Sequence, residues 1–375
     1  MRDFVDASAG GAWPWGKPAL LSGSTLAGST LARTTLVAAV ALAAPPAAAQ
    51  ELNLSAFQQF FASAGESEGD ASDRSFAFST DTEVHVDGQI QADNGITFGF
   101  HVEFEADSGA TNNVDENSLW AAGDFGKLEF GNNDGVEDTF LINGTSTDPD
   151  YGSVGNPTST FLTSAFAGEA RTSAELRSGS LETADATKIS YTTPTFAGFN
   201  AGFSYTPDSS DGSDGNAFHA AEATGFHDNL SFGLGYDGEF NSVGFQAALV
   251  GAFARADAEP EDGGYGIGGG MALEVSGFTV AAGAIWDDLD GNGGQGWATD
   301  LGLAYGSGPW FFSLNGIYSK DDDSGDELLG SSANVRYNLA PGVSIFAVGY
   351  LGEEDLGASG SNEIMAISSG LRLSF

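Results

Sequence analysis

The sequence predicts an all-β fold, a sixteen-stranded antiparallel transmembrane β-barrel in which one long loop folds inward. Three observations support this fold class. Segments of alternating apolar and polar residues recur along the chain, and tight turns alternate with long acidic connections between them. Beyond the amino-terminal region, no window reaches the roughly 18 consecutive apolar residues that a transmembrane helix needs. A chain that crosses a bilayer without helices has to close its strands into a barrel.

The amino-terminal residues are expected to be a targeting signal. Arg33 precedes the apolar run at residues 36–44, and small residues lead up to Ala49. A positive residue, a short apolar core and an Ala-x-Ala site are typical of a secretory signal. We expect cleavage after Ala49, so that residues 1–49 are the signal peptide and residues 50–375 form the barrel. The alternative, a single-pass anchor, would need a longer apolar run.

The composition restricts the function classes. The 375 residues carry a formal net charge of −40, with 28 Phe, 9 Tyr, 6 Trp and no Cys. Disordered acidic chains contain few aromatic residues, whereas a barrel holds aromatic residues in its wall and charges in its loops and lumen. The acidic balance argues against nucleic-acid binding, and the lack of Cys excludes disulfides and Cys-ligated metal sites.

The strands are expected to have one lipid-facing side and one lumenal side. In the last strand, residues 363–375, the apolar Met365 and Ile367 alternate with Ala366 and Ser368, and Arg372 lies on the polar side. Sixteen strands fit between residue 52 and Phe375. Strand 52–64 alternates poorly and is kept because an even count needs it. Short turns are expected at residues 94–95, 124–126, 195–198, 241–244, 276–277, 306–309 and 341–342.

Two early strands place charged residues on their inward side. They form a hairpin around the Asn94-Gly95 turn. The residues expected to line the pore here are Asp81, Glu83, His85, His101, Glu103 and Glu105. A face with this many charges needs water, so it is predicted to line a wet lumen and to favour cations.

One connection is much longer than the others. Alternation fails over residues 132–186, which contain the carboxylates Asp134, Glu137 and Asp138 together with the apolar Phe140 and Ile142. Loops beyond about 15 residues are usually functional or disordered. Because a freely solvated loop would not need these apolar residues, we expect this one to fold against the inner wall and narrow the channel.

The chain resembles the trimeric general-diffusion porins of Gram-negative outer membranes, closest to the alphaproteobacterial members. The resemblance rests on FGKLEFG at residues 125–131, KISYTTPTFAGF at 188–199 and LRLSF at 371–375. It implies an outer-membrane homotrimer whose third loop enters the lumen and opposes basic wall residues. The matching acids would be Asp134, Glu137 and Asp138. The available bases, which alternation turns inward, would be Lys127, Lys188, Arg336 and Arg372.

A weak metal signal lies in a later connection. Asp288, Asp290 and Asn292 match the first half of a calcium loop, but position twelve is Thr299 rather than Glu, so an EF-hand is not predicted. A looser Ca²⁺ site in the acidic surface loops stays open, and no other cofactor is expected.

The combined expectation is a passive, cation-preferring pore for small hydrophilic solutes and ions, in contact with outer-membrane lipid and without catalytic chemistry. The four His residues show no metalloprotease spacing, and a nucleophile elbow is absent from the sequence. Two alternatives stay open: a solute-specific channel, and a non-conducting structural or adhesive surface barrel.

Overall fold

The computed structural model describes residues 50–67, 76–106, 114–148, 174–176, 181–209, 226–256, 263–289, 294–357 and 360–375. The expected signal peptide, residues 1–49, lies outside this part of the chain. Among the described residues, no helix is both long and apolar enough to cross a membrane.

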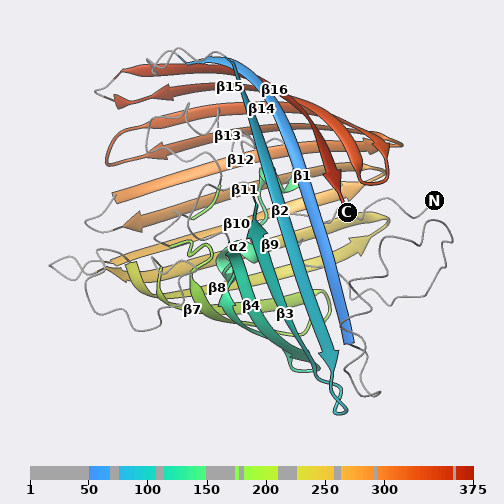
Figure 1. The fold of residues 1–375 in the computed structure, drawn as a ribbon. Coiled ribbons are helices and arrows are strands. Elements are labelled where there is room, and N and C mark those ends of the chain that lie inside the picture. Colours follow the sequence, from blue (N-terminus) through green and yellow to red (C-terminus); the bar gives the residue numbers. More distant parts are fainter. Residues whose placement is uncertain are drawn as a thin grey trace.

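Sixteen strands form one closed antiparallel barrel (Figure 1). They are β1 Gln50–Ser67, β2 Phe76–Gln91, β3 Thr97–Glu105, β4 Val114–Gly123, β5 Gly126–Asn132, β6 Thr187–Thr192, β7 Phe199–Asp208, β8 Phe226–Phe240, β9 Val243–Ala256, β10 Gly263–Val275, β11 Phe278–Leu289, β12 Gly294–Ser307, β13 Trp310–Asp321, β14 Glu327–Ala340, β15 Val343–Asp355 and β16 Ser361–Ser374. Each strand pairs with its sequence neighbours, and β1 also pairs with β16. The predicted fold class is confirmed.

The seam between β1 and β16 explains why the first strand alternates poorly. Its inward positions carry aromatic rings, since Phe57 and Phe61 are 4% and 0% exposed. The Arg372 guanidinium lies 4.2 Å from the centre of the Phe57 ring, and the Phe61 and Phe346 rings are 5.4 Å apart. Both faces of β1 are therefore partly apolar, which hides the two-residue period.

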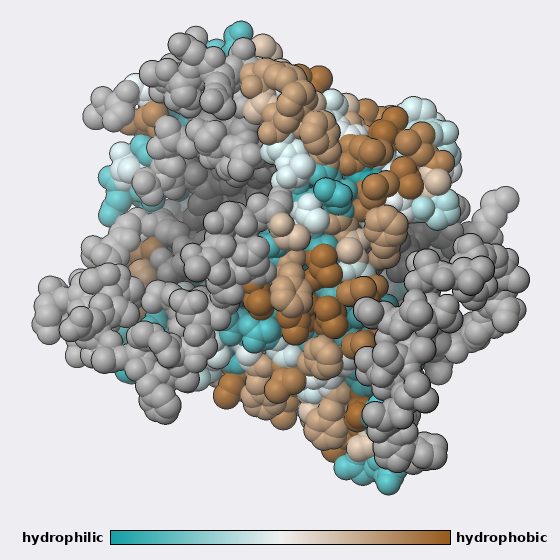
Figure 2. Space-filling model, in the orientation of Figure 1, coloured by the Kyte–Doolittle hydropathy of each residue, from teal (hydrophilic) through white to brown (hydrophobic). Residues whose placement is uncertain are grey.

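The outer face of the wall is apolar. Leu301, Leu314, Met365 and Ile367 are between 55% and 59% exposed on this face, as the alternation predicts. Figure 2 shows hydrophobic residues over much of the visible wall. The seven short turns predicted from the sequence all connect adjacent strands. At the first, Gly95 has a φ of 83°, a conformation that favours glycine.

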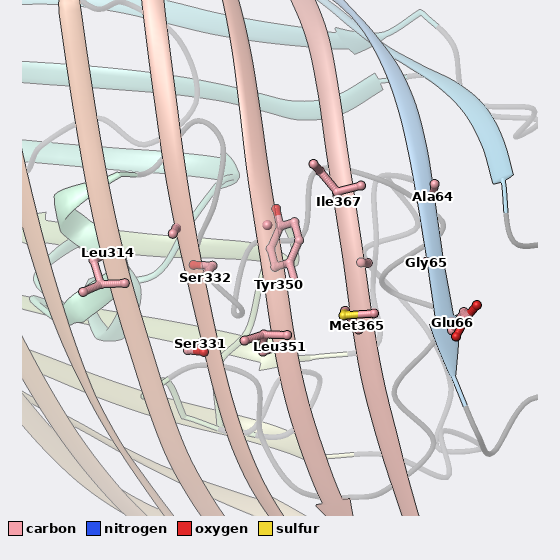
Figure 3. A pocket seen from close by; sticks show the side chains of 13 residues that line it. Ala64, Gly65, Glu66, Leu314, Ser331, Ser332, Tyr350, Leu351, Met365 and Ile367 are labelled. Atoms are coloured by element: carbon pink, nitrogen blue, oxygen red, sulfur yellow. The ribbon is translucent and has the colours of Figure 1, made fainter.

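A groove of about 630 Å³ crosses the outside of the barrel from β1 to β13 (Figure 3). It is lined by the small residues Ala333 and Gly349 and by the larger Leu314, Leu351 and Met365. Because these large side chains point outward, the groove is separate from the channel.

Candidate functional site

The described part of the connection between β5 and β6 lies inside the barrel, as the sequence predicts. It contains a short helix, α2 (Val136–Thr139), and a 3₁₀ turn, η2 (Gly144–Thr147). Val136 and Phe140 are buried against inward residues of the wall that include Val250 and Ile285. The apolar residues of this loop therefore form a core between the loop and the wall.

Glycines let the loop lie directly on the wall strands. A Cβ at Gly270 on β10 would lie 1.8 Å from the carbonyl oxygen of Ile142, and one at Gly302 on β12 would lie 2.0 Å from that of Gly144. Real Cβ atoms do not approach backbone this closely. The loop backbone thus occupies space that any other residue at Gly270 or Gly302 would take.

Three carboxylates fasten the loop to the wall. Asp300 on β12 accepts hydrogen bonds through Oδ1 from the backbone N–H groups of Gly144, at 2.7 Å, and Gly283, at 3.0 Å. Asp148 accepts hydrogen bonds from the Ser313 hydroxyl and, at 2.7 Å, from the Asn334 amide. Glu137, near the start of the loop, is the third.

Glu137 was expected at the channel surface, but the structure buries it at 2% exposure. Its carboxylate accepts hydrogen bonds from the Thr183 hydroxyl at 2.7 Å and from the Ser231 hydroxyl on β8. A buried carboxylate needs such donors, because leaving its oxygens unpaired away from water is costly. Glu137 therefore holds the loop rather than lining the pore.

Lys188 is also buried, at 2% exposure, where an open basic wall residue was expected. Its Nζ donates to the carbonyl oxygens of Asn133 and Ala184, one on each limb of the β5–β6 connection. Lys188 thus joins the start and the end of the loop and provides positive charge beside Asp134.

Several half-buried carboxylates lie close together on the loop. Burial raises the pKa of Asp134, and burial together with the nearby Asp134 raises the pKa of Asp138 well above its usual value. Burial and the carboxylates of Asp115 and Asp134 raise the pKa of Asp185 to about 7. Glu116 on β4 joins this group, since carboxylate oxygens of Glu116, Asp134 and Asp185 lie within 4.8 Å of one another.

The wall formed by β2 and β3 carries paired polar residues. The strand register places three inward pairs in succession: Asp87 opposite His101, His85 opposite Glu103, and Glu83 opposite Glu105. Asp81 lies one inward position further along β2, where its carboxylate accepts a hydrogen bond from the Gln59 amide at 2.9 Å. All six residues predicted to line this wall thus share its inward face.

The remaining predicted basic residues lie one each on three strands, β5, β14 and β16. Lys127 on β5 contacts Glu129, with Nζ 2.6 Å from Oε2. The Arg336 guanidinium lies 4.5 Å from the centre of the Phe311 ring, and Arg372 lies against Phe57. Within the described strands, these bases do not form a continuous ladder opposite the loop.

The candidate calcium loop is only partly described. Asp288 ends up on β11, where Oδ2 accepts a hydrogen bond from the Gln295 amide at 2.9 Å, while Asp290 and Asn292 lie outside the described residues. The prediction of a Ca²⁺ site there stays a prediction.

Comparison with known proteins decides the family. A family profile described as Gram-negative porin matches residues 35–355. The chain belongs to the Gram-negative porin family. This porin is therefore a passive channel of the outer membrane, in a family and fold of channels rather than enzymes. A search of curated proteins finds no match to it.

Solved structures share the porin fold at low identity. An anion-selective porin from Comamonas acidovorans is 16% identical, with a TM-score of 0.62 over 87% of this chain and 100% of that one. OmpT of Vibrio cholerae, in a trimer form, is 14% identical, with a TM-score of 0.61 over 87% of this chain and 99% of that one. A mutant porin of Rhodobacter blastica is 16% identical, with a TM-score of 0.55 over 87% of this chain and all of that one.

Sequence patterns alone do not single out Asp300, Asp148 or Glu116 as site residues. Asp300 occupies an inward position of an alternating strand, next to Gly302 and opposite Gly283. A single carboxylate among inward glycines was the sequence feature that could have indicated this contact. Glycines leave space for a backbone segment against the wall, and the carboxylate can accept hydrogen bonds from that segment. Which segment occupies the space depends on how the loop folds.

Proposed function

We propose that this porin is a cation-preferring diffusion pore for small hydrophilic solutes and ions. The supporting observation is the excess of carboxylates over bases on the inner surface. Acids lie on both the loop and the β2–β3 wall, whereas Lys127 is paired with Glu129 and Lys188 is buried. Charged groups around a narrow pore attract counterions and repel ions of like charge.

The constriction in this proposal is the space between the loop and the β2–β4 wall. In this proposal Asp134 and Asp185 border it from the loop as one cluster with Glu116 on β4, and Asp138 lies beside Asp134. A low-dielectric wall focuses the field of such charges into the aqueous space, which raises the local cation concentration. Size exclusion at this point and electrostatic filtering are the whole mechanism, without energy coupling.

The proposal differs in sign from the anion selectivity named for the Comamonas porin. At 16% identity the likeness concerns the fold and does not determine the lumenal charges of this chain. A solute-specific channel would use a continuous aromatic track or a basic patch in the lumen. Inward Phe311 lies under Arg336 rather than in such a track.

The test is ion selectivity in planar bilayers with the refolded mature chain. The double variant Asp134→Asn with Asp138→Asn should lower the cation-to-anion permeability ratio by about twofold or more. The comparison should be made at an alkaline pH, because the pKa values of both residues are raised and a higher pH favours their charged forms. The matched control is Asp93→Asn with Asp124→Asn, which removes two charges at exposed short turns. Equal ratios in both double variants would contradict the proposal.

We also propose a homotrimer. OmpT, which shares the fold, has been solved in a trimer form, and the outer face of this barrel is broadly apolar. Light scattering of the detergent-solubilised protein, corrected for bound detergent, should give three times the chain mass. A monomer mass under conditions that preserve the folded barrel would contradict this assignment.

A further inference from the structure

We propose that the wall formed by β2 and β3 carries a binding site for a divalent transition metal such as Zn²⁺, with His85, His101 and Glu103 as its ligands. One ligand atom from each of these three side chains lies within 4.8 Å of the others. The site is independent of the channel's ion preference, because it rests on side-chain geometry alone.

The distances fit tetrahedral coordination. Oε2 of Glu103 lies 3.2 Å from Nδ1 of His85 and 3.5 Å from Nε2 of His101. Zinc bonds of about 2.0–2.2 Å place neighbouring ligand atoms of a tetrahedral site about 3.3–3.6 Å apart. The three side chains therefore stand close to metal-ligand spacing, and water would take the fourth position.

The second nitrogen of each histidine faces another carboxylate. Nδ1 of His101 lies 2.8 Å from Oδ1 of Asp87, and Nε2 of His85 lies 3.2 Å from Oε2 of Glu83. Metal-binding histidines commonly donate their other ring N–H to a carboxylate, which fixes the tautomer and orients the ring. Here both histidines have this arrangement, on two adjacent strands.

The strand register makes the arrangement rigid. His85 lies directly opposite Glu103, and His101 lies directly opposite Asp87, so one antiparallel pair supplies all of these groups. The two imidazole rings are 5.7 Å apart between centres. Sites on paired strands hold their geometry better than sites on loops.

The charge of the surroundings favours a dication. Five carboxylates, those of Glu83, Asp87, Glu103, Glu105 and Glu116, surround the two imidazoles. Even two fully protonated histidines would leave negative charge in excess. The site is also reachable from lumenal water, because the side chain of His101 is 25% exposed and that of Asp87 45% exposed.

The ligand set selects the class of metal. Imidazole nitrogens suit Zn²⁺ and similar transition metals, whereas Ca²⁺ and Mg²⁺ prefer sites made of oxygen ligands. A site with two histidines should therefore bind Zn²⁺ well in the presence of excess Ca²⁺ or Mg²⁺.

The first test is calorimetric titration of the folded barrel with ZnCl₂ at pH 7.5 in millimolar Mg²⁺. We expect one Zn²⁺ per chain at this site, with at least about tenfold weaker binding in His85→Gln and in His101→Gln. Asp87→Asn, which leaves the three ligands in place, should weaken binding by about 10- to 100-fold. The control His227→Gln changes a histidine on β8, away from this wall, and should bind Zn²⁺ as the unaltered protein does.

A second measurement uses the unaltered chain, so it does not depend on how the variants fold. In ¹⁵N NMR of histidine side chains, Zn²⁺ should shift the ring nitrogens of His85 and His101 and leave those of His227 in place. Zn²⁺ binding that shifts neither His85 nor His101 would overturn the proposal. So would an absence of Zn²⁺ binding, or equal affinity in both histidine variants and the unaltered protein.

Discussion

Replacing Asp300 should release the inward loop while leaving the barrel intact. The Asp300 carboxylate accepts two hydrogen bonds from the loop, from the backbone N–H groups of Gly144 at 2.7 Å and Ala174 at 3.4 Å, and one from Gly283 on β11. In Asp300→Ala all three donors lose their acceptor. The backbone of η2 then keeps its packing against Gly302 but loses its hydrogen bond to the charged carboxylate.

The expected loss of docking free energy comes mainly from the shorter of the two hydrogen bonds that Asp300 accepts from the loop. A hydrogen bond to a charged group contributes about 1.5–3 kcal/mol, and the 2.7 Å distance to Gly144 places this one among the stronger bonds. A loss of about 2–3 kcal/mol lowers the ratio of docked to undocked loop by about 30- to 140-fold. Asp300→Asn keeps one acceptor oxygen and should show a smaller effect in the same direction.

Single-channel recording and limited proteolysis report on loop docking separately. The alanine variant should show more current fluctuation in planar bilayers and faster cleavage within the β5–β6 connection. Its thermal unfolding should stay close to that of the unaltered protein, because the strand pairing is unchanged. Asp237→Ala is the matched control, since Asp237 accepts a hydrogen bond from Gln246 at 2.9 Å away from the loop.

Two results would refute this reasoning. One is an Asp300→Ala protein whose current and cleavage rate equal those of the unaltered protein. The other is an Asp237→Ala protein that behaves as Asp300→Ala does, which would show that any inward carboxylate has the same effect.

Three further predictions address other parts of the account. Burial and neighbouring carboxylates raise the pKa of Asp185 to about 7, so this carboxyl is mostly neutral below that pH and mostly ionised above it. The cation preference measured from reversal potentials should therefore rise between about pH 6 and 8. The Asp185→Asn protein should not show this rise. Gly270→Ala places a Cβ against the backbone of Ile142, so it should lower the free energy of unfolding in urea by about 1–3 kcal/mol or speed proteolytic cleavage of the loop. Gly349→Ala, which has open space around the new Cβ, should change neither quantity. Deleting Phe375 removes two backbone hydrogen bonds to Ala56, of 2.9 and 3.3 Å, and should lower the free energy of unfolding by about 1–3 kcal/mol. An unchanged urea midpoint would show that these bonds between β1 and the end of the chain do not contribute to stability.

The sequence predicts the barrel because apolar and polar residues alternate along most of its strands, which is a local pattern. Every strand with a clear two-residue period, such as β16 with Met365 and Ile367, shows the lipid-facing side directly. The first strand is harder to recognise in the sequence, because its aromatic residues Phe57 and Phe61 point inward and mask the alternation. Their partners, Arg372 and Phe346, come from the other end of the chain and only meet them when the barrel closes.

The site was predictable only in part, for a related reason. Alternation shows that Glu83, His85 and Glu103 face inward, but which of them stand opposite each other depends on strand register. The loop carboxylates follow no period, so the sequence does not separate Glu137, which is buried against Ser231, from Asp134, which is only half-buried. That distinction arises from how the loop packs on the wall.

The most direct test of the account is the reversal potential of the refolded mature porin across a KCl gradient at pH 8. An excess of inward carboxylates predicts stepwise conductance and a reversal potential whose sign shows K⁺ crossing more readily than Cl⁻. A reversal potential of the opposite sign would leave the porin fold in place and contradict the acidic lumen as the filter, and a folded barrel without conductance would contradict the open channel itself.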